Sequence, residues 1–228
     1  MFKRFSICYI LFMFCITGTS AQEDRWTGNA TNLSKGNLRV NSSGRYLEYS
    51  DGTPFLYMGD TAWELISRLN DKETELYLEN RREKGFTVIQ TVILDELDDM
   101  DVSSNGEPKL IDGNIDKPAP GYFTHVDKVI SLAAAKGLYI ALLPTWGDKV
   151  DKQWGKGPEI FTPENAYRYG KWLGERYMNA PNLIWIIGGD RSGDGKNFAI
   201  WNALATGIKS VDKNHLMTYH PHGEHSSS

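Results

Sequence analysis

The sequence predicts an α/β fold, the (β/α)8 TIM barrel, with about the first five strands present and a small β-hairpin before them. Two observations favour this fold. Short, nearly continuous apolar runs alternate with helical segments, which is typical of parallel strands covered by helices. In addition, Gly59 stands alone after the first expected strand, where a dinucleotide-binding sheet would carry three glycines. A barrel is therefore favoured over an open nucleotide-binding sheet.

Residues 1–21 are typical of a secretory signal peptide, with Lys3 and Arg4 ahead of an apolar core at 7–16 and small residues at 19–21. That core is far shorter than the roughly 20 residues that cross a bilayer, so we expect export without a membrane span. The product would be periplasmic, extracellular or on the cell surface. A lipoprotein is a minor alternative, because Cys15 lies inside the core rather than after the cleavage point. Residues 22–37 form a polar leader without periodicity.

Residues 38–228 are expected to form one barrel domain, incomplete at its C-terminal end. Asn70 with Glu73 starts a helix, Gly85 ends it, and Thr162 followed by proline starts another. The runs 38–40 and 45–49, separated by turn residues, predict the hairpin. The barrel strands are expected at 54–58, 86–94, 138–143, 183–187 and 216–219, with helices from about 70, 125–136, 162 onward and 197–211.

Composition excludes some partners and favours others. The formal net charge is −4 with both signs interleaved, so no basic stripe is available for nucleic acid. Seven Trp and eleven Tyr residues suit stacking on sugar rings, although most aromatic side chains belong to cores. An oligo- or polysaccharide is therefore the expected ligand.

The segments that follow the expected strands are unusually polar, and reactive groups of a barrel stand at these exits. Asp190 is the predicted catalytic acid, because five apolar residues and two glycines carry it out of the barrel. We expect it beside Trp185 and Trp146, partly desolvated, as suits a general acid. The alternative is that Asp190 belongs to a turn and caps the next helix.

The other exits supply predicted substrate-binding residues. Carboxylates that bind hydroxyls and indoles that stack on sugars are the residue types carbohydrate chemistry needs. Asp60 could instead cap the segment at Thr61, the indoles could be core, and Glu96 could belong to a solvated acidic loop with Asp98, Asp99 and Asp101. The predicted set is Asp60, Trp63, Glu96, Trp146, Asp148, Arg191, His220 and His222, and Trp154 is a further platform candidate.

Three histidines near the C-terminus raise the question of a metal. His220, His222 and His225 lie close together, but their spacing fits no familiar zinc pattern. We predict no metal and no cofactor, and keep a metal-dependent hydrolase using His220, His222 and Asp60 as a third hypothesis.

Several motifs in order resemble the apiosidase-like glycoside hydrolases of family 140, over about 38–228. They are Asp51-Gly52-Thr53-Pro54-Phe55 through Gly59-Asp60-Thr61-Ala62-Trp63, Tyr122-Phe123 with His125-Val126-Asp127, Leu142 to Asp148, Ile184 to Arg191, and Thr218 to Gly223. The resemblance implies that Asp190 is the acid/base and that a glutamate from a later strand, beyond the end of this chain, is the nucleophile. It implies plant cell-wall polysaccharide as substrate, with apiose side chains of pectin as the example.

The chain departs from the family pattern in two places. The segment 103–118 does not follow the expected loop, and five strands are visible where a closed barrel has eight. We therefore expect the chain alone to be inactive. The runner-up function is a non-catalytic carbohydrate-binding or adhesion module, which would lack a glutamate opposite Asp190.

Overall fold

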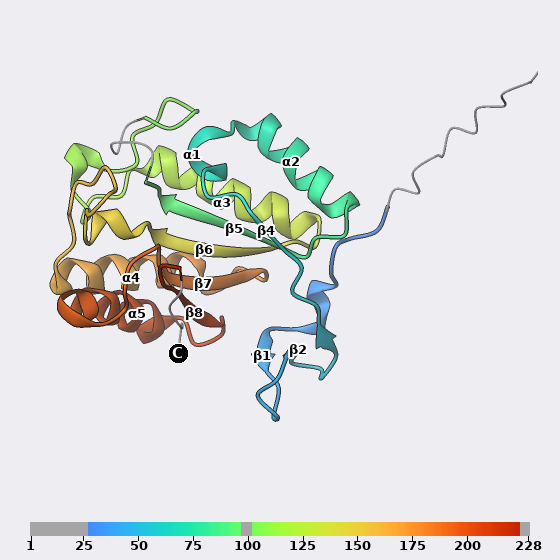
Figure 1. Cartoon of the computed structure of the whole chain (residues 1–228). Coiled ribbons are helices and arrows are strands. Elements are labelled where there is room, and N and C mark those ends of the chain that lie inside the picture. The colour runs from blue at the N-terminus through green and yellow to red at the C-terminus, as the bar shows by residue number, and fades with distance from the viewer. Residues whose placement is uncertain (1–26, 97–101, 224–228) are drawn as a thin grey trace, which may run out of the picture.

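The structure, a computed structural model, describes residues 27–96 and 102–223 (Figure 1). Its main part is a parallel sheet with strand order β4-β5-β6-β7-β8. The strands are β4 (Gly59–Thr61), β5 (Val88–Leu94), β6 (Tyr139–Thr145), β7 (Leu183–Gly188) and β8 (Met217–His220). The helices are α1 (Leu65–Arg68), α2 (Asp71–Glu83), α3 (Pro120–Ala135), α4 (Pro163–Tyr177) and α5 (Phe198–Val211). The predicted parallel sheet is confirmed, and four of the five predicted strands, 86–94, 138–143, 183–187 and 216–219, match β5 to β8.

A second, antiparallel sheet of order β1-β2-β3 precedes the parallel one, with strands β1 (Leu38–Val40), β2 (Leu47–Tyr49) and β3 (Pro54–Phe55). The predicted hairpin is confirmed, but the prediction that 54–58 is the first barrel strand was wrong. Pro54 and Phe55 pair with Glu48 and Leu47 of β2 instead. The first barrel strand begins only at Gly59, because Pro54 lacks the N–H that a central strand must donate and sits at the edge of the small sheet.

Alternate residues of the parallel strands face two different cores. Ile89, Ile140 and Trp185 pack under the helices in the larger core. Val88, Tyr139 and neighbours of the same parity pack in a smaller core with Leu38, Tyr49 and Phe55 of the small sheet. In Figure 1 the small sheet lies near the end of the parallel sheet where its strands begin. The opposite end, where the strands finish, carries the polar exits.

Local sequence explains where the helices begin. Asn70 and Glu73 form the predicted capping box of α2. Thr162 caps α4, but its partner in the box is Asn165. Helix α3 begins at Pro120, five residues earlier than predicted, because proline fits the first helical turn, where its missing N–H has no partner to lose. None of the helices in the described ranges is long and apolar enough to cross a membrane.

The described part of the leader, from residue 27, is attached to the helix layer. The N–H of Ala30 donates to the carbonyl of Lys136 (2.9 Å), and the Thr31 hydroxyl donates to that of Gly137 (2.6 Å). Arg82 of α2 donates to the carbonyl of Gly28. The signal-peptide prediction falls on residues outside the described ranges.

Glu79 of α2 ties this region together and makes stability depend on pH. It accepts hydrogen bonds from Arg82 and from Lys136 Nζ (2.9 Å), which lower the pKa of its carboxyl from 4.5 to about 2. A carboxyl whose pKa is lowered by folding contributes stability above its unfolded pKa, and this contribution is lost as pH falls through the folded value. Because the side chain is 37% exposed, solvent screens the pair and the contribution is small.

We expect Glu79→Gln to lower the free energy of unfolding at pH 7 by about 0.5 kcal/mol. The fall of that free energy between pH 4.5 and about 2 should become shallower in the variant. Urea denaturation across this pH range measures both. Glu175→Gln is the control, because Glu175 and Lys171 form an exposed pair at 3.7 Å. Parallel stability–pH curves for the wild type and Glu79→Gln would contradict the assignment.

Candidate active site

Three rings gather at the finishing end of the parallel sheet. Trp63 follows β4, Trp146 follows β6 and His220 ends β8. The ring centroids are 5.2 Å apart for Trp63 and Trp146, 5.4 Å for Trp63 and His220, and 5.7 Å for Trp146 and His220. Strands that are not adjacent thus bring three predicted residues into one aromatic cluster. Trp146 is only 4% exposed, so Trp63 is the more accessible indole.

The segment Gly188-Gly189-Asp190 forms a tight elbow at the end of β7. All three residues have positive φ, of 106°, 124° and 55°. A Cβ at Gly188 would lie 2.4 Å from the carbonyl oxygen of His220, and one at Gly189 would lie 2.7 Å from the nitrogen of Gly147. Only glycine fits at these two positions, whereas aspartate is among the side chains that enter the left-handed region most readily.

Gly189 fixes this elbow between the neighbouring strand exits. Its N–H donates to the carbonyl of His220 (3.0 Å), and its carbonyl accepts from the N–H of Gly147 (3.0 Å). The backbone beside Asp190 is thus held from both sides. The next helical segment has Asp194 at its N-cap, so Asp190 does not cap it as the alternative interpretation proposed.

Asp190 projects toward the aromatic cluster. Its Oδ1 lies 3.3 Å from Nε2 of His220, and the side chains are 42% and 33% exposed. The expectation that Asp190 lies beside Trp185 was wrong, because Trp185 faces the helix layer and its indole N–H donates to the buried Asp212 (2.7 Å). The carboxyl is therefore open to solvent and to a substrate.

A second group of charges lies beside Asp190. Burial, followed by the negative charge of Asp148, raises the pKa of the Glu96 carboxyl, and Asp190 acts in the same direction; Arg191 and Lys149 oppose it. Fully buried Asp148 pairs with the equally buried Lys149 (3.0 Å) and accepts the N–H of Gly157 (2.8 Å). Among the described residues, its other oxygen Oδ1 has no hydrogen-bond partner. Glu96 and Asp148 thus belong to the electrostatic surroundings of Asp190.

Arg191 lies directly after the elbow but is fully buried. Its guanidinium donates to the carbonyls of Asp151, Lys152 (2.8 Å) and Asp190 (2.9 Å), and it lies 4.3 Å from the ring centre of Trp154. Arg191 therefore joins the loop after β6 to the elbow. Trp154 is 65% exposed and leaves an indole face open near the site.

Two predicted site residues, Asp60 and His222, contact groups outside the aromatic cluster. Asp60 accepts hydrogen bonds from Tyr77 (2.6 Å) and Arg81 of α2, on the helix side of β4. Burial opposes ionisation of Asp60, but these hydrogen bonds outweigh it and lower the pKa of the carboxyl. His222 follows β8, with Nδ1 3.0 Å from the carbonyl oxygen of Gly223. A role of either side chain in sugar binding stays a prediction.

The third hypothesis required a metal. Within residues 27–96 and 102–223, no group of three or more His, Cys, Asp or Glu side chains is placed to hold one. His225, like Asp98, Asp99 and Asp101, lies outside the described residues. Asp60 and His220 each have protein partners instead, Arg81 and Asp190.

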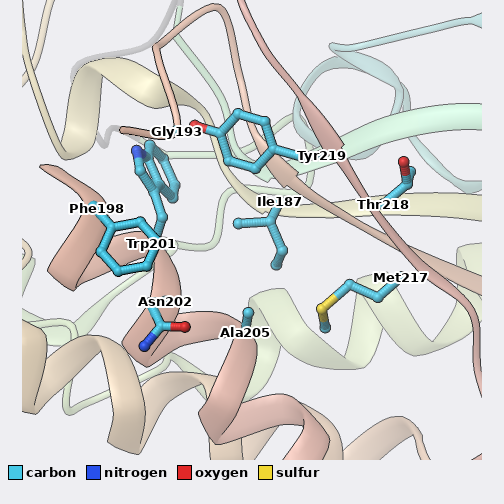
Figure 2. Close-up of a pocket in the computed structure, with 9 residues that line it drawn as sticks. All are labelled: Ile187, Gly193, Phe198, Trp201, Asn202, Ala205, Met217, Thr218 and Tyr219. Atoms are coloured by element: carbon cyan, nitrogen blue, oxygen red, sulfur yellow. The ribbon is translucent and has the colours of Figure 1, made fainter. Parts of the chain in front are cut away.

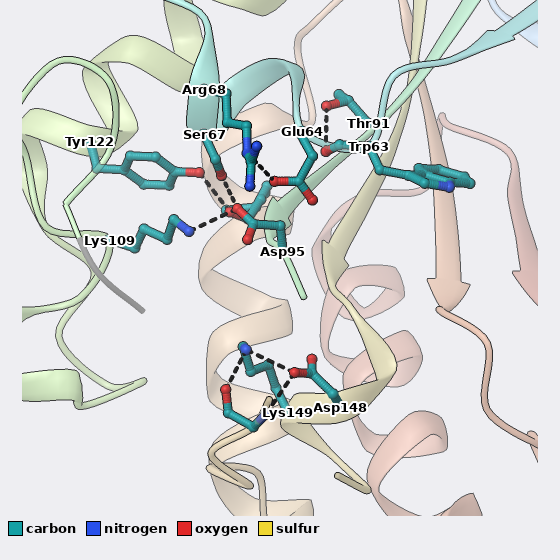
Figure 3. A network of polar contacts seen from close by, with 12 residues as sticks. Trp63, Glu64, Ser67, Arg68, Thr91, Asp95, Lys109, Tyr122, Asp148 and Lys149 are labelled. Carbon is teal, nitrogen blue, oxygen red and sulfur yellow. Dashed lines mark hydrogen bonds and ion pairs between the residues drawn. The ribbon is translucent and has the colours of Figure 1, made fainter. Parts of the chain in front are cut away.

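A buried ion pair next to the site was missed by sequence reasoning. Lys109 Nζ lies 2.8 Å from Oδ2 of Asp95, which also accepts from Ser67; Asp95 is 1% exposed and Lys109 is fully buried (Figure 3). Lys109 belongs to the segment 103–118 that departs from the family pattern. No signal marked it, since an isolated lysine in a polar loop is ordinarily exposed.

A cavity of about 390 Å³ lies on the helix side of the sheet, between α5 and β8 (Figure 2). Trp201, Met217 and Tyr219 are among the side chains that line it. None of the predicted site residues does. The chemistry-bearing groups gather instead at the strand ends, where barrel enzymes place them.

Comparisons with known proteins fit this geometry. Residues 41–228 match the sequence model of a family described as apiosidase-like, catalytic domain. The chain belongs to this apiosidase-like family. No curated protein matches it. Among solved structures, a glycoside hydrolase is 43% identical to this chain with a TM-score of 0.74. The match covers 83% of this chain and 42% of the chain of that hydrolase. A family 5 glycoside hydrolase from Bacteroides vulgatus is 36% identical with a TM-score of 0.76, at 86% and 41% coverage.

A more distant likeness concerns the fold alone. The catalytic domain of an endoglucanase from Thermobifida fusca is 15% identical with a TM-score of 0.53. The apiosidase-like chain is thus a curled five-stranded part of a TIM barrel, as predicted. It spans about two fifths of the length of the two more similar structures.

Proposed function

We propose that this chain carries the general acid/base, Asp190, of a glycoside hydrolase that acts on plant cell-wall polysaccharide. Apiose side chains are the first candidate substrate, as the family description suggests, and pectin is the polysaccharide that the resemblance of the sequence motifs implies. The observation that carries the proposal is the position of Asp190. It stands on a rigid glycine elbow at the finishing end of a barrel strand, exposed, and beside a cluster of two indoles and an imidazole.

The chemistry follows from a pair of carboxyl groups. Asp190 would protonate the glycosidic oxygen as the bond to the leaving sugar breaks, while a second carboxylate attacks the sugar or activates water. In the family pattern that partner is a glutamate from a later strand, so we place it outside residues 1–228. A separation of about 5 Å between the two carboxyl groups would indicate retention of configuration, and roughly 6.5–9.5 Å inversion.

Aromatic side chains would hold the sugar. Trp63 is the accessible indole of the cluster, and Trp154 offers a second face across the loop after β6. Apolar sugar faces stack on such rings, and nearby carboxylates accept bonds from hydroxyls. Glu96, which is only partly buried, is the candidate for the second task; Asp148 is fully buried, so its role in sugar binding stays a prediction. Export, indicated by residues 1–21, would bring the enzyme to polysaccharide outside the cytoplasm.

The test uses two proteins. One is the 228-residue chain, and the other, called the hybrid barrel, is the 43% identical glycoside hydrolase with its matching segment replaced by that of this chain. We expect the hybrid barrel to release sugar from pectin fragments that bear apiose, and the chain alone to show no turnover because we propose that the partner carboxylate belongs to a later strand. Product analysis by chromatography measures both.

The controls separate this function from the runner-up. Pectin fragments from which apiose has been removed test the choice of sugar. A hybrid barrel that melts cooperatively and binds these fragments without cleaving any glycoside would favour the non-catalytic carbohydrate-binding module instead.

A further inference from the structure

We infer that His220 is a positioning residue for Asp190, holding the carboxyl in the orientation that proton donation requires. This inference rests on the proposed function for its catalytic meaning, but the contact itself can be tested separately. The first observation is the pair itself. Nε2 of His220 lies 3.3 Å from Oδ1 of Asp190, and the two residues come from neighbouring strands.

Backbone contacts between β7 and β8 fix the positions from which the Asp190 and His220 side chains project. Gly188 is the register partner of His220 in the ladder between β7 and β8, and Gly189 N–H donates to the His220 carbonyl (3.0 Å). A side chain at Gly188 would strike that same carbonyl, at 2.4 Å. The elbow is therefore built at a spacing that brings Asp190 to His220 and that only glycine permits.

The ring of His220 is held as well. Trp63 and Trp146 lie 5.4 and 5.7 Å from it and 5.2 Å from each other, centre to centre, so the imidazole packs against both indoles. Such ring contacts favour particular ring orientations and restrict the rotation of the imidazole. With the ring confined, Nε2 is the atom that faces the carboxyl, and a neutral imidazole must carry its proton there to donate.

The contact with His220 restricts the rotation of the Asp190 side chain. The Asp190 side chain is 42% exposed, and within the described residues its other hydrogen bonds are made by its backbone, including the bond from Arg191 to its carbonyl (2.9 Å). Without a donor at Oδ1, the carboxyl would sample several rotamers. Donation from His220 to Oδ1 across this 3.3 Å contact would leave Oδ2 as the oxygen that can carry the proton toward a glycosidic bond.

The contact is tested on the 228-residue chain itself by the tautomer of His220, read from long-range ¹H–¹⁵N spectra of the imidazoles above pH 8. His220→Gln identifies the signals. We expect the Nε2–H form to dominate, and Asp190→Asn to change the ratio of the two tautomers roughly tenfold, as the loss of a hydrogen bond to a charged acceptor implies. Asp194→Asn is the matched control and should leave the ratio unchanged. A dominant Nδ1–H form, or a ratio that Asp190→Asn does not move, would overturn the inference.

The positioning role is tested in the hybrid barrel with two substrates. His220→Leu should lower kcat about tenfold or more on an unactivated glycoside with KM nearly unchanged. It should have little effect on the first-turnover release of dinitrophenol from a dinitrophenyl glycoside, because this leaving group needs no proton. His220→Gln, which keeps an N–H donor, should recover much of the loss. Equal losses on both substrates would mean that His220 is merely structural.

The two proposals fail in different ways. If Asp190→Asn abolishes turnover of the unactivated glycoside while His220→Leu does not discriminate between the substrates, the proposed function stands and the positioning role falls. If the tautomer ratio responds to Asp190→Asn but turnover does not, the contact stands and Asp190 is not the acid.

Discussion

Asp190→Asn in the hybrid barrel is expected to lower kcat on an unactivated glycoside by about 10²–10⁴-fold, the usual contribution of general acid–base catalysis. Asparagine is chosen because Asp190 has a φ of 55°, and asparagine enters that region nearly as readily as aspartate, so the elbow should survive. The amide cannot donate the proton that an alkoxide leaving group requires. Initial rates at saturating substrate measure the loss.

The substrate dependence makes this result specific. A dinitrophenyl glycoside should release its dinitrophenol in the first turnover at nearly the wild-type rate, because this leaving group departs without a proton. Sugar binding, followed as KM or by titration calorimetry, should change little. Asp194→Asn, at the exposed N-cap that follows the elbow, is the control and should retain wild-type rates. Full turnover of the unactivated glycoside by Asp190→Asn would remove Asp190 from its role.

Most of the fold could be predicted from the sequence, because the strands β5, β6 and β7 are nearly continuous apolar runs and the helix starts carry local signals. Asn70 and Thr162 cap helices as their side chains predict. The failures occur where the local signal is ambiguous. The apolar run at 54–58 could belong to either sheet, and only pairing with β2 decides it.

The sequence predicted at which end of the sheet the site residues meet, but it predicted less well which way each side chain points. Strand exits collect at one end of a parallel sheet, so Asp190, Trp63, Trp146 and His220 were expected to meet there, and the structure brings them together. The sequence does not show on which face of the sheet a side chain at a strand end lies. Asp60 pairs in register with Ile89, which faces the helices, and its carboxyl therefore contacts Arg81 of α2.

Trp185 illustrates the same difficulty from the other side. It lies near Asp190 in the sequence, but it faces the helix layer and contacts Asp212. The two glycines between them have φ values of 106° and 124°, so the alternation of side chains cannot be continued through the elbow. The ion pair of Lys109 and Asp95 could not be predicted either, because its partners are 14 residues apart and no local pattern links them.

That ion pair should be worth more to stability than any surface pair in the chain. Lys109→Met is expected to lower the free energy of unfolding by about 3–5 kcal/mol, because it leaves the carboxylate of Asp95 buried without its cation. Urea denaturation measures the change. Lys117→Met is the matched control: Lys117 lies in the same loop and forms an exposed pair with Asp112 at 3.6 Å, so its loss should cost less than about 1 kcal/mol.

A double variant separates the pair from the packing of the lysine stem. Asp95→Asn added to Lys109→Met removes the buried charge yet keeps an acceptor for Ser67, and should restore a large part of the lost stability. The loop is also tied to α1 by the Ser104 N–H, which donates to the carbonyl of Ser67 (2.9 Å). Lys109 therefore anchors the segment 103–118 to Asp95, the residue before Glu96. If Lys109→Met costs no more than Lys117→Met, the pair is not the anchor of that loop.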